Sequence, residues 1–180
     1  SRGLGDVYKR QVPSVDLILE PYAEKSYRRA LAKYERLGVA ADLAEKEALA
    51  DVKKEFEQGF QGWEYKFNTV ASSRGDYPFI TVTAGTGTGK FAQMATITML
   101  EVRRKGQGKK DHKKPVLFPK IVFLYDENIH GKGKISEDVF EAGVDCSAKT
   151  MYPDWLSMSG KGYISSMYKQ YGNCLLYTSD

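Results

Sequence analysis

Two short apolar segments on either side of one amphipathic segment constrain this chain more than any other feature. Residues 77–84 (YPFITVTA) and 116–125 (VLFPKIVFLY) are rich in β-branched and aromatic side chains, so both are predicted to be strands. Residues 90–104 between them carry apolar side chains at helical spacing. A strand, a helix and a second strand in this order pair in parallel through a right-handed crossover. The first strand is apolar on both faces, so we expect helices to cover the sheet.

Two helices are predicted before the first strand. Residues 21–37 place apolar and aromatic side chains three and four positions apart, and Gly38 follows as a C-terminal stop. Asp42 and Glu45 form an N-terminal capping pair for a longer helix, whose apolar face continues to residue 67. The N-terminal half of the chain is therefore predicted to be mainly helical.

Two further helices are predicted after the second strand. One begins at Ser136, because Glu137 and Asp138 stand in its first turn, and it ends at Pro153. A last short helix runs to Tyr171. The resulting order of helix, helix, strand, helix, strand, helix, helix belongs to the α/β class. Since two strands cannot complete such a sheet, we expect a slice of a larger α/β sheet or barrel.

The two ends of the chain differ from its middle. Residues 1–11 show no helical or strand periodicity, and residues 174–180 follow a Gly-Asn turn and break the preceding pattern. Both strings resemble translated sequencing-adapter read-through, so we expect artefactual tails at 1–11 and 174–180. The evolved part is then residues 12–173, a fragment of one α/β domain. The alternative is that both ends are genuine, frayed termini.

Composition excludes several classes of protein. Among 180 residues, 27 Lys and Arg against 23 Asp and Glu give a net charge of +4, which does not by itself require a nucleic acid or membrane partner. The longest apolar-rich stretch, residues 116–125, is too short to span a bilayer. Two cysteines are too few for a disulfide scaffold or a zinc ribbon. The default expectation is a reduced, cytoplasmic protein without a membrane segment.

Residues 84–90 (AGTGTGK) have the context of a phosphate-binding loop, since they lie between a predicted strand and a predicted helix. The pattern fails at two positions. Ala84 replaces the first glycine, and Phe91 stands where a Ser or Thr would hold magnesium. A tight turn is therefore favoured over a nucleotide-hydrolysing loop, and a loop that touches substrate phosphates is left open.

The stretch 103–114 (RRKGQGKKDHKK) is strongly basic and has no interleaved aromatic side chain. It could bind phosphate backbones as a nucleic-acid-binding module, but a solvated loop is the favoured interpretation. His112 and His130 lack partners at metal-ligand spacing and are predicted to be surface or loop histidines. Cys146 is predicted to be a small buried apolar residue. No catalytic set and no metal site can be assembled from spacing.

Residues 68–79 (NTVASSRGDYPF) gather small polar side chains, a glycine and an arginine ahead of a buried strand. Loops of this kind carry binding groups in α/β folds, so the segment indicates a polar ligand nearby. The alternative is a turn that only makes local backbone hydrogen bonds.

Four stretches together resemble the anaerobic, class III ribonucleoside-triphosphate reductases, which are glycyl radical enzymes. They follow one another along the whole core of the chain: residues 11–22 (QVPSVDLILEPY), residues 58–69 (QGFQGWEYKFNT) continuing through 72–75 (SSRG) to Pro78 and Phe79, residues 118–123 (FPKIVF), and Cys146 through residues 151–154 (MYPD).

The resemblance implies a ten-stranded α/β barrel of two half-barrels, of which this chain is a partial slice. It implies that the ribose 2′-hydroxyl of a ribonucleoside triphosphate is replaced by hydrogen, for deoxyribonucleotide biosynthesis and DNA replication. A glycyl radical, installed by an S-adenosylmethionine iron–sulfur activase, would generate a cysteine thiyl radical. Structural zinc, ATP and deoxynucleotide effectors with allosteric control, and a homodimer are also implied. The substrate-binding residues suggested by the most characteristic segment are Asn68, Ser72, Ser73, Gly75, Pro78 and Phe79.

The chain also departs from the family's pattern. The radical glycine loop, the four-cysteine zinc site and the ATP-binding module of the family do not occur in this sequence. Cys174 lacks the Met-Gly-Cys-Arg context of the family's thiyl cysteine, so no catalytic residue is assigned. We therefore expect the isolated fragment to be inactive. The alternative within enzymes is another glycyl radical enzyme of the formate-lyase type.

Overall fold

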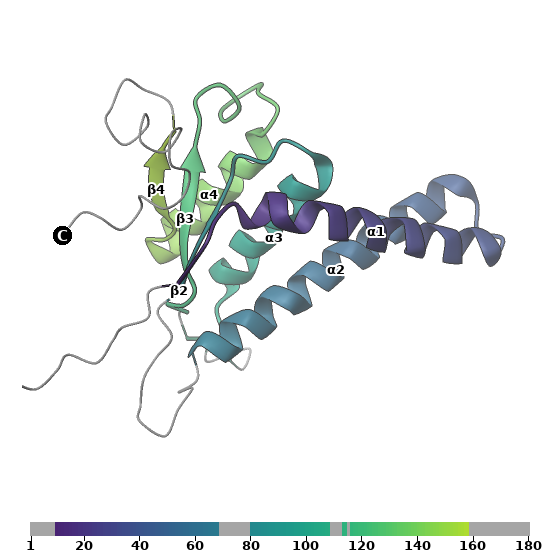
Figure 1. Ribbon diagram of the computed structural model, residues 1–180, viewed down its shortest axis with the longest axis horizontal. Helices are drawn as coiled ribbons and strands as arrows, with labels where there is room; N and C mark the ends of the chain where they lie inside the picture. The colour runs from purple at the N-terminus through teal and green to yellow at the C-terminus, as the bar shows by residue number, and fades with distance from the viewer. Residues whose placement is uncertain (1–9, 69–79, 109–112, 115, 159–180) are drawn as a thin grey trace, which may run out of the picture.

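The computed structural model describes residues 10–68, 80–108, 113–114 and 116–158. These residues form four strands and four helices (Figure 1). In chain order the elements are β1 (Arg10–Val12), α1 (Val15–Arg36), α2 (Ala41–Asn68), β2 (Ile80–Ala84), α3 (Lys90–Lys105), β3 (Lys120–Tyr125), α4 (Glu137–Thr150) and β4 (Asp154–Ser157).

The four strands form one parallel sheet in the order β1-β2-β3-β4. The predicted parallel pairing of the two central strands is confirmed, with Val82 opposite Ile121 and Ala84 opposite Phe123. Each strand therefore pairs with the next strand along the chain, and the order never reverses. The structure is α/β with a predominance of helix, as the sequence predicts.

The two outer strands were not predicted by the sequence pattern. Arg10 and Gln11 fall within the segment predicted to be a tail, yet they pair with Ile80 and Thr81. The prediction that a helix runs up to Pro153 is wrong, because α4 ends at Thr150 and β4 follows it. Strands of three and four residues are too short for an alternating pattern to identify them. These two strands form through their pairing with β2 and β3 instead.

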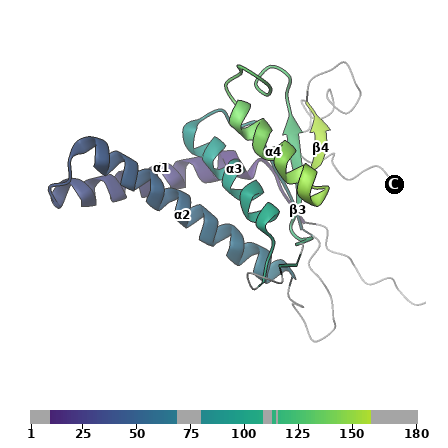
Figure 2. The ribbon, with the colours of Figure 1, turned by 180° about the vertical axis from the view of Figure 1, so that it is seen from behind.

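The core lies between the sheet and the helices α3 and α4, which cover one of its faces (Figure 2). Side chains of successive strand residues point to opposite faces, so Val82 and Ala84 share a face with Ile121 and Phe123. These four side chains are buried against the helices. The intervening Leu124 is also buried but lies outside that core cluster, on the other face.

Helix α1 begins six residues before the predicted start at Pro21. Proline lacks the N–H of a helix interior, so the sequence favours it near a helix start. Here the first turn is held by tertiary contacts instead, because the side chains of Val15 and Asp16 are fully buried. Local propensity is overridden by burial at this helix end.

Helices α1 and α2 run antiparallel and extend beyond the sheet as a pair (Figure 1). Helix α2 matches the predicted long helix closely, and Phe56, Phe60, Trp63 and Phe67 follow one another along it with ring contacts. Within the described parts of the chain, every helix is too short or too polar to cross a lipid bilayer.

A buried ion pair joins these long helices to the sheet. The guanidinium of Arg103 on α3 donates from Nε to Glu64 Oε1 of α2 at 2.8 Å, and from Nη2 to the carbonyl oxygen of Pro119 at 2.6 Å. Both side chains are about 95% buried or more. Burial raises the pKa of the Glu64 carboxyl, and the hydrogen bond and charge of Arg103 oppose that rise. Arg103 thus does not belong to a solvated basic loop, contrary to the sequence interpretation.

We expect Arg103→Met to lower the free energy of unfolding by about 3–5 kcal/mol, because it leaves the Glu64 carboxylate buried without its partner. Arg104→Met is the matched control, since the Arg104 side chain is 40% exposed and its contact with Asp145 spans 3.7 Å. The control should change stability by less than about 1 kcal/mol. Urea unfolding followed by circular dichroism measures both, and equal effects of the two variants would contradict the role given to the buried pair.

Candidate functional site

The carboxyl ends of β1, β2 and β3 meet at one edge of the sheet, where parallel α/β folds place their ligands. The turn after β1 is tied to β2, because the N–H of Ser14 donates to Thr83 Oγ1 at 2.8 Å. Residues 85–89 connect β2 to α3, and residues 126–136 connect β3 to α4. Polar side chains from these connections converge at this edge.

The glycine-rich loop 85–89 binds the carboxylate of Asp16, an anionic side chain of the same protein. Asp16, in the first turn of α1, accepts hydrogen bonds at Oδ2 from the N–H groups of Gly85 (3.1 Å) and Gly87 (2.9 Å). Its side chain is 0% exposed. The loop is therefore not an open phosphate cradle, and the prediction of a tight turn is favoured by these contacts.

Two glycines of this loop, Gly85 and Gly87, are required by close packing. Gly85 has φ +124°, and a Cβ there would lie 2.9 Å from the carbonyl oxygen of Leu124. A Cβ on Gly87 would lie 2.5 Å from the Cβ of Ala92, whereas Gly89, which precedes α3, faces the carboxylate at the flexible end of Glu20. Two carboxylates of α1 thus approach the loop and the positive end of α3, where negative charge is favourable.

His130 holds the same loop from the other side. Its Nδ1 accepts from the N–H of Asp126 at 2.9 Å, and its Nε2 lies 2.8 Å from the carbonyl oxygen of Gly85. A carbonyl oxygen can only accept, so Nε2 must carry the proton and Nδ1 must be bare. Both ring nitrogens are satisfied by backbone groups, and the imidazole is held in its neutral form.

The surroundings of His130 are apolar on two sides. The imidazole contacts the rings of Phe123 and Tyr125, and the residue is 0% exposed. Burial lowers the pKa of His130, while the hydrogen bond to Gly85 and the nearby Asp126 oppose this effect. The sequence interpretation of a loop histidine is correct, but the histidine is not on the surface. Nothing in residues 126–131 distinguishes a buried from an exposed imidazole.

Asn68, the first of the predicted substrate-binding residues, lies at the opposite edge of the sheet. Its side-chain amide donates to the carbonyl oxygens of Glu64 (2.6 Å) and Phe118 (2.5 Å), and its Oδ1 accepts from the N–H of Phe118 at 3.2 Å. Phe118 lies just before β3. Asn68 thus fixes the entry of β3 to the end of α2.

The other predicted substrate-binding residues, Ser72, Ser73, Gly75, Pro78 and Phe79, lie outside the described residues. Their role stays a prediction, as does the substrate contact of Asn68. The same holds for His112, for the last predicted helix, for Cys174, and for the tails apart from Arg10 and Gln11.

Cys146 is confirmed as a small buried residue. It is 0% exposed within the core, and burial raises the pKa of its thiol. Its Sγ lies near the hydroxyl of Thr150, one turn further along α4. A buried thiol with a raised pKa is a poor nucleophile. Among the described residues, no three His, Cys, Asp or Glu side chains are grouped so that they could hold a metal ion.

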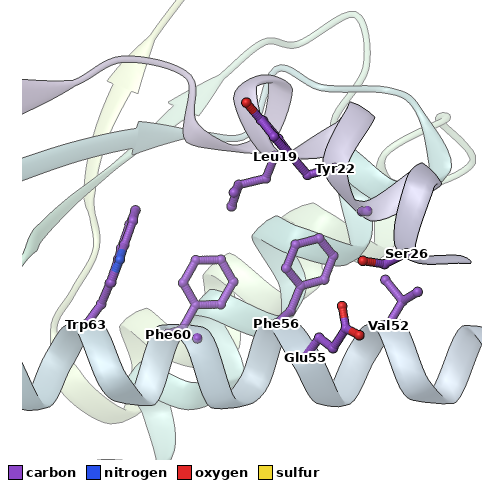
Figure 3. Close-up of a pocket in the computed structure, with 10 residues that line it drawn as sticks. Leu19, Tyr22, Ser26, Val52, Glu55, Phe56, Phe60 and Trp63 are labelled. Atoms are coloured by element: carbon purple, nitrogen blue, oxygen red, sulfur yellow. The ribbon is translucent and has the colours of Figure 1, made fainter. Parts of the chain in front are cut away.

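A separate apolar groove of about 230 Å³ lies between α1 and α2 (Figure 3). The rings of Phe56, Phe60 and Trp63 rise from α2 toward α1, and Leu19 points down toward them. Glu55 is the one charged side chain among the described residues that line it. The groove offers carbon surface and no cation for a phosphate.

Comparison with known proteins identifies the family. The family model described as anaerobic ribonucleoside-triphosphate reductase matches residues 11–178. The anaerobic ribonucleoside-triphosphate reductase of enterobacteria phage T4 is 34% identical over 145 residues, which are 80% of this chain. The proteins of the same name from Haemophilus influenzae and Escherichia coli are 33% and 29% identical, each over 89% of this chain.

These matches cover nearly all of this chain but only 22–23% of the length of the relatives. The chain belongs to the anaerobic ribonucleoside-triphosphate reductase family, as the resemblance of its sequence motifs indicates. The chain spans about a fifth of the enzymes it matches.

We expect the stability of the fold to fall as the pH drops below about 6.5, because of His130. Its folded-state pKa lies below the ordinary value of 6.5, so the unfolded chain binds the proton first. Between the two pKa values this single group contributes a slope of at most about 1.4 kcal/mol per pH unit. Chemical unfolding at pH 5–8 measures the slope, and His130→Gln should reduce it. An unchanged slope in the variant would assign the acid sensitivity to other groups.

We expect Asn68→Ala to lower the free energy of unfolding by about 1–3 kcal/mol, because the N–H and carbonyl of Phe118 lose their hydrogen bonds with the Asn68 side chain. Asn68→Asp should not restore stability, since a carboxylate oxygen would face the carbonyl oxygen of Phe118. Gln61→Ala, at an exposed position of the same helix, is the control and should be nearly neutral. A neutral Asn68→Ala variant would contradict the role of Asn68 at the entry of β3.

Proposed function

We propose that this chain is one part of an anaerobic ribonucleoside-triphosphate reductase, which converts ribonucleoside triphosphates to deoxyribonucleoside triphosphates. The observation that carries the proposal is the match of the reductase family model over residues 11–178. The relatives that match are themselves named anaerobic ribonucleoside-triphosphate reductases. The activity belongs to the longer enzyme, and this chain contributes part of its framework.

The strand order supports a place in the wall of the implied ten-stranded barrel. Parallel strands that follow one another in chain order, joined by crossovers of one hand, put their helices on one side. Closed α/β barrels are wound in this way, whereas doubly wound sheets reverse their order at a switch point. In the barrel we propose, the face with Val82 and Phe123 is the outer face under α3 and α4. The face with Thr81, Thr83 and Leu124 is then the inner one.

The radical chemistry implied by the resemblance would be supplied by groups elsewhere in the longer enzyme. A glycyl radical, installed by an S-adenosylmethionine iron–sulfur activase, would provide the one-electron chemistry that replaces the 2′-hydroxyl. The described residues do not fit the groups involved, since Cys146 faces the core and no metal-ligand cluster is present among them. This chain would therefore act through binding and positioning.

Partners follow from the same proposal. The longer enzyme would bind a ribonucleoside triphosphate as substrate, ATP or deoxynucleotides as effectors, and the activase. It would form a homodimer and work in the cytoplasm. Its structural zinc would be held outside the described residues. Residues 68–79 would contribute Asn68, Ser72, Ser73, Gly75, Pro78 and Phe79 to substrate binding. Asn68 lies at the amino edge of the sheet, so this contribution would be separate from that of the glycine-rich loop at the carboxyl edge. Asn68, the one described residue of this segment, also has a structural role, because its side chain binds the backbone of Phe118 at the entry of β3.

The alternatives gain no support from a specific contact. A nucleic-acid-binding module would use the basic stretch 103–114, but Arg103 is buried in an ion pair and is not available for phosphate. Gln107 and Lys114 pair with each other across the base of this loop. For the formate-lyase type, no described contact favours acyl transfer over ribonucleotide reduction.

The function is tested with the full-length protein that contains this chain, prepared without oxygen and treated with its activase. We expect each ribonucleoside triphosphate, or a subset chosen by effectors, to yield the deoxy product in chromatography. Omitting the activase is the control and should abolish turnover. An activated protein that reduces none of the four nucleotides would overturn the proposal.

The substrate-side segment is tested by Ser73→Ala in the same enzyme. If the hydroxyl binds substrate, kcat/KM should fall about tenfold with an unchanged melting temperature, which is the effect of losing one hydrogen bond. Ser26→Ala, in the groove between α1 and α2, is the matched control and should leave kinetics unchanged. Unchanged kinetics in Ser73→Ala would reduce the segment to a turn.

A further inference from the structure

One peptide group at the carboxyl edge of the sheet is held from both sides by buried side chains. The N–H of Gly85 donates to Asp16 Oδ2, and its carbonyl oxygen accepts from His130 Nε2. The imidazole is fixed in turn by the N–H of Asp126. We call these linked groups, Asp16, Gly85, Gly87, His130 and Asp126, the loop clamp. It ties α1, the loop after β2 and the loop after β3 to one another.

The loop clamp is more costly than a turn requires. Both Asp16 and His130 are 0% exposed, and Asp16 Oδ1 has no hydrogen-bond partner among the described residues. Burying a carboxylate with an unsatisfied oxygen is unfavourable, and a β-strand-to-helix turn with glycines can form without it. Costly polar groups that fix a loop are characteristic of sites where the loop geometry matters.

The position of the clamp indicates which geometry matters. It fixes the connection between β2 and α3 at the carboxyl edge of parallel strands, which is the edge that forms ligand sites in α/β folds. Thr86 lies between the two glycines that Asp16 binds, and it is partly exposed. The loop therefore presents a surface of fixed shape at that edge.

We propose that Asp16 and His130 are positioning residues of the reductase, which hold the Gly85–Gly89 loop as a fixed part of the substrate-facing rim and release it when the imidazole is protonated. This proposal rests on the proposed function. Neither side chain needs to touch substrate, because each acts through the backbone of Gly85 and Gly87.

The pH sensitivity follows from the tautomer. A proton on Nδ1 would face the N–H of Asp126, so the protonated ring loses this bond and places two donors against each other. The charged groups around the ring are Asp126 and Lys134 from its own loop and Asp16 of α1 beyond Gly85, and Tyr125 of β3 stacks on it. Asp126 favours the proton and Lys134 opposes it, and burial lowers the pKa of the ring.

The test uses the full-length, activated reductase and four variants: His130→Leu, His130→Gln, Asp16→Ala and, as the control, Asp42→Ala. Asp42 also stands in the first turn of a helix but is exposed. Steady-state kinetics with a ribonucleoside triphosphate at pH 5.5–8 are combined with amide hydrogen exchange of a peptide covering Gly85–Gly89.

We expect His130→Leu and Asp16→Ala to lower kcat/KM at least about tenfold and to speed amide exchange of the loop, with Asp42→Ala unchanged in both. His130→Gln keeps a donor for the Gly85 carbonyl and cannot be protonated. It should retain most of the activity at neutral pH and lose less activity than the unmodified enzyme as the pH falls below 6.5.

Each outcome decides one claim. If the unmodified enzyme reduces no ribonucleotide, the proposed function fails and the positioning proposal falls with it. If it is active but His130→Leu and Asp16→Ala exchange loop amides faster at unchanged kcat/KM, the clamp is only structural and the positioning proposal alone is overturned. If either variant fails to fold, the pH dependence of His130→Gln tests the proposal. A loss of activity below pH 6.5 identical to that of the unmodified enzyme would overturn the release of the loop on protonation.

Discussion

The guanidinium of Arg103 connects three elements that are otherwise separate in the sequence. It binds the carboxylate of Glu64 on α2 and the carbonyl oxygen of Pro119 before β3, and it is itself part of α3. A buried charge is tolerated only with its partners in place, so α2, α3 and the entry of β3 cannot move apart independently. Asn68 adds a second connection between α2 and the same entry, through the backbone of Phe118.

At the opposite edge of the sheet, buried polar side chains likewise hold backbone segments in place through hydrogen bonds. There Asp16 and His130 satisfy the backbone of the loop after β2, whereas the core cluster between the two edges consists of apolar side chains. Apolar packing of Val82 and Phe123 against α3 and α4 supplies most of the driving force for folding. The polar contacts at the two edges determine where each strand starts and where each loop leaves the sheet.

The elements that the sequence predicts well are those long enough to show a period. Apolar spacing predicts α2, α3 and the central strands β2 and β3 directly. The four sequence stretches that resemble the reductases predict the family. Strands β1 and β4 were missed because three or four residues carry no period. The burial of Arg103, interpreted as part of a solvated loop, and of His130, interpreted as a surface or loop histidine, was missed because sequence spacing does not reveal a partner 39 or 45 residues away. Among the predicted substrate-binding residues, only Asn68 is described, and its visible contacts are with the backbone.

The carboxylate of Asp16 is an internal ligand of the glycine-rich loop, since it accepts hydrogen bonds from two of the loop's amide groups. Two amide N–H groups at the carboxyl edge of a sheet would ordinarily attract phosphate. Because Asp16 is attached to α1, its effective concentration at these amides is far higher than that of a freely diffusing anion. The amides of Gly85 and Gly87 are therefore already occupied, and any external anion would have to displace Asp16 before it could bind them.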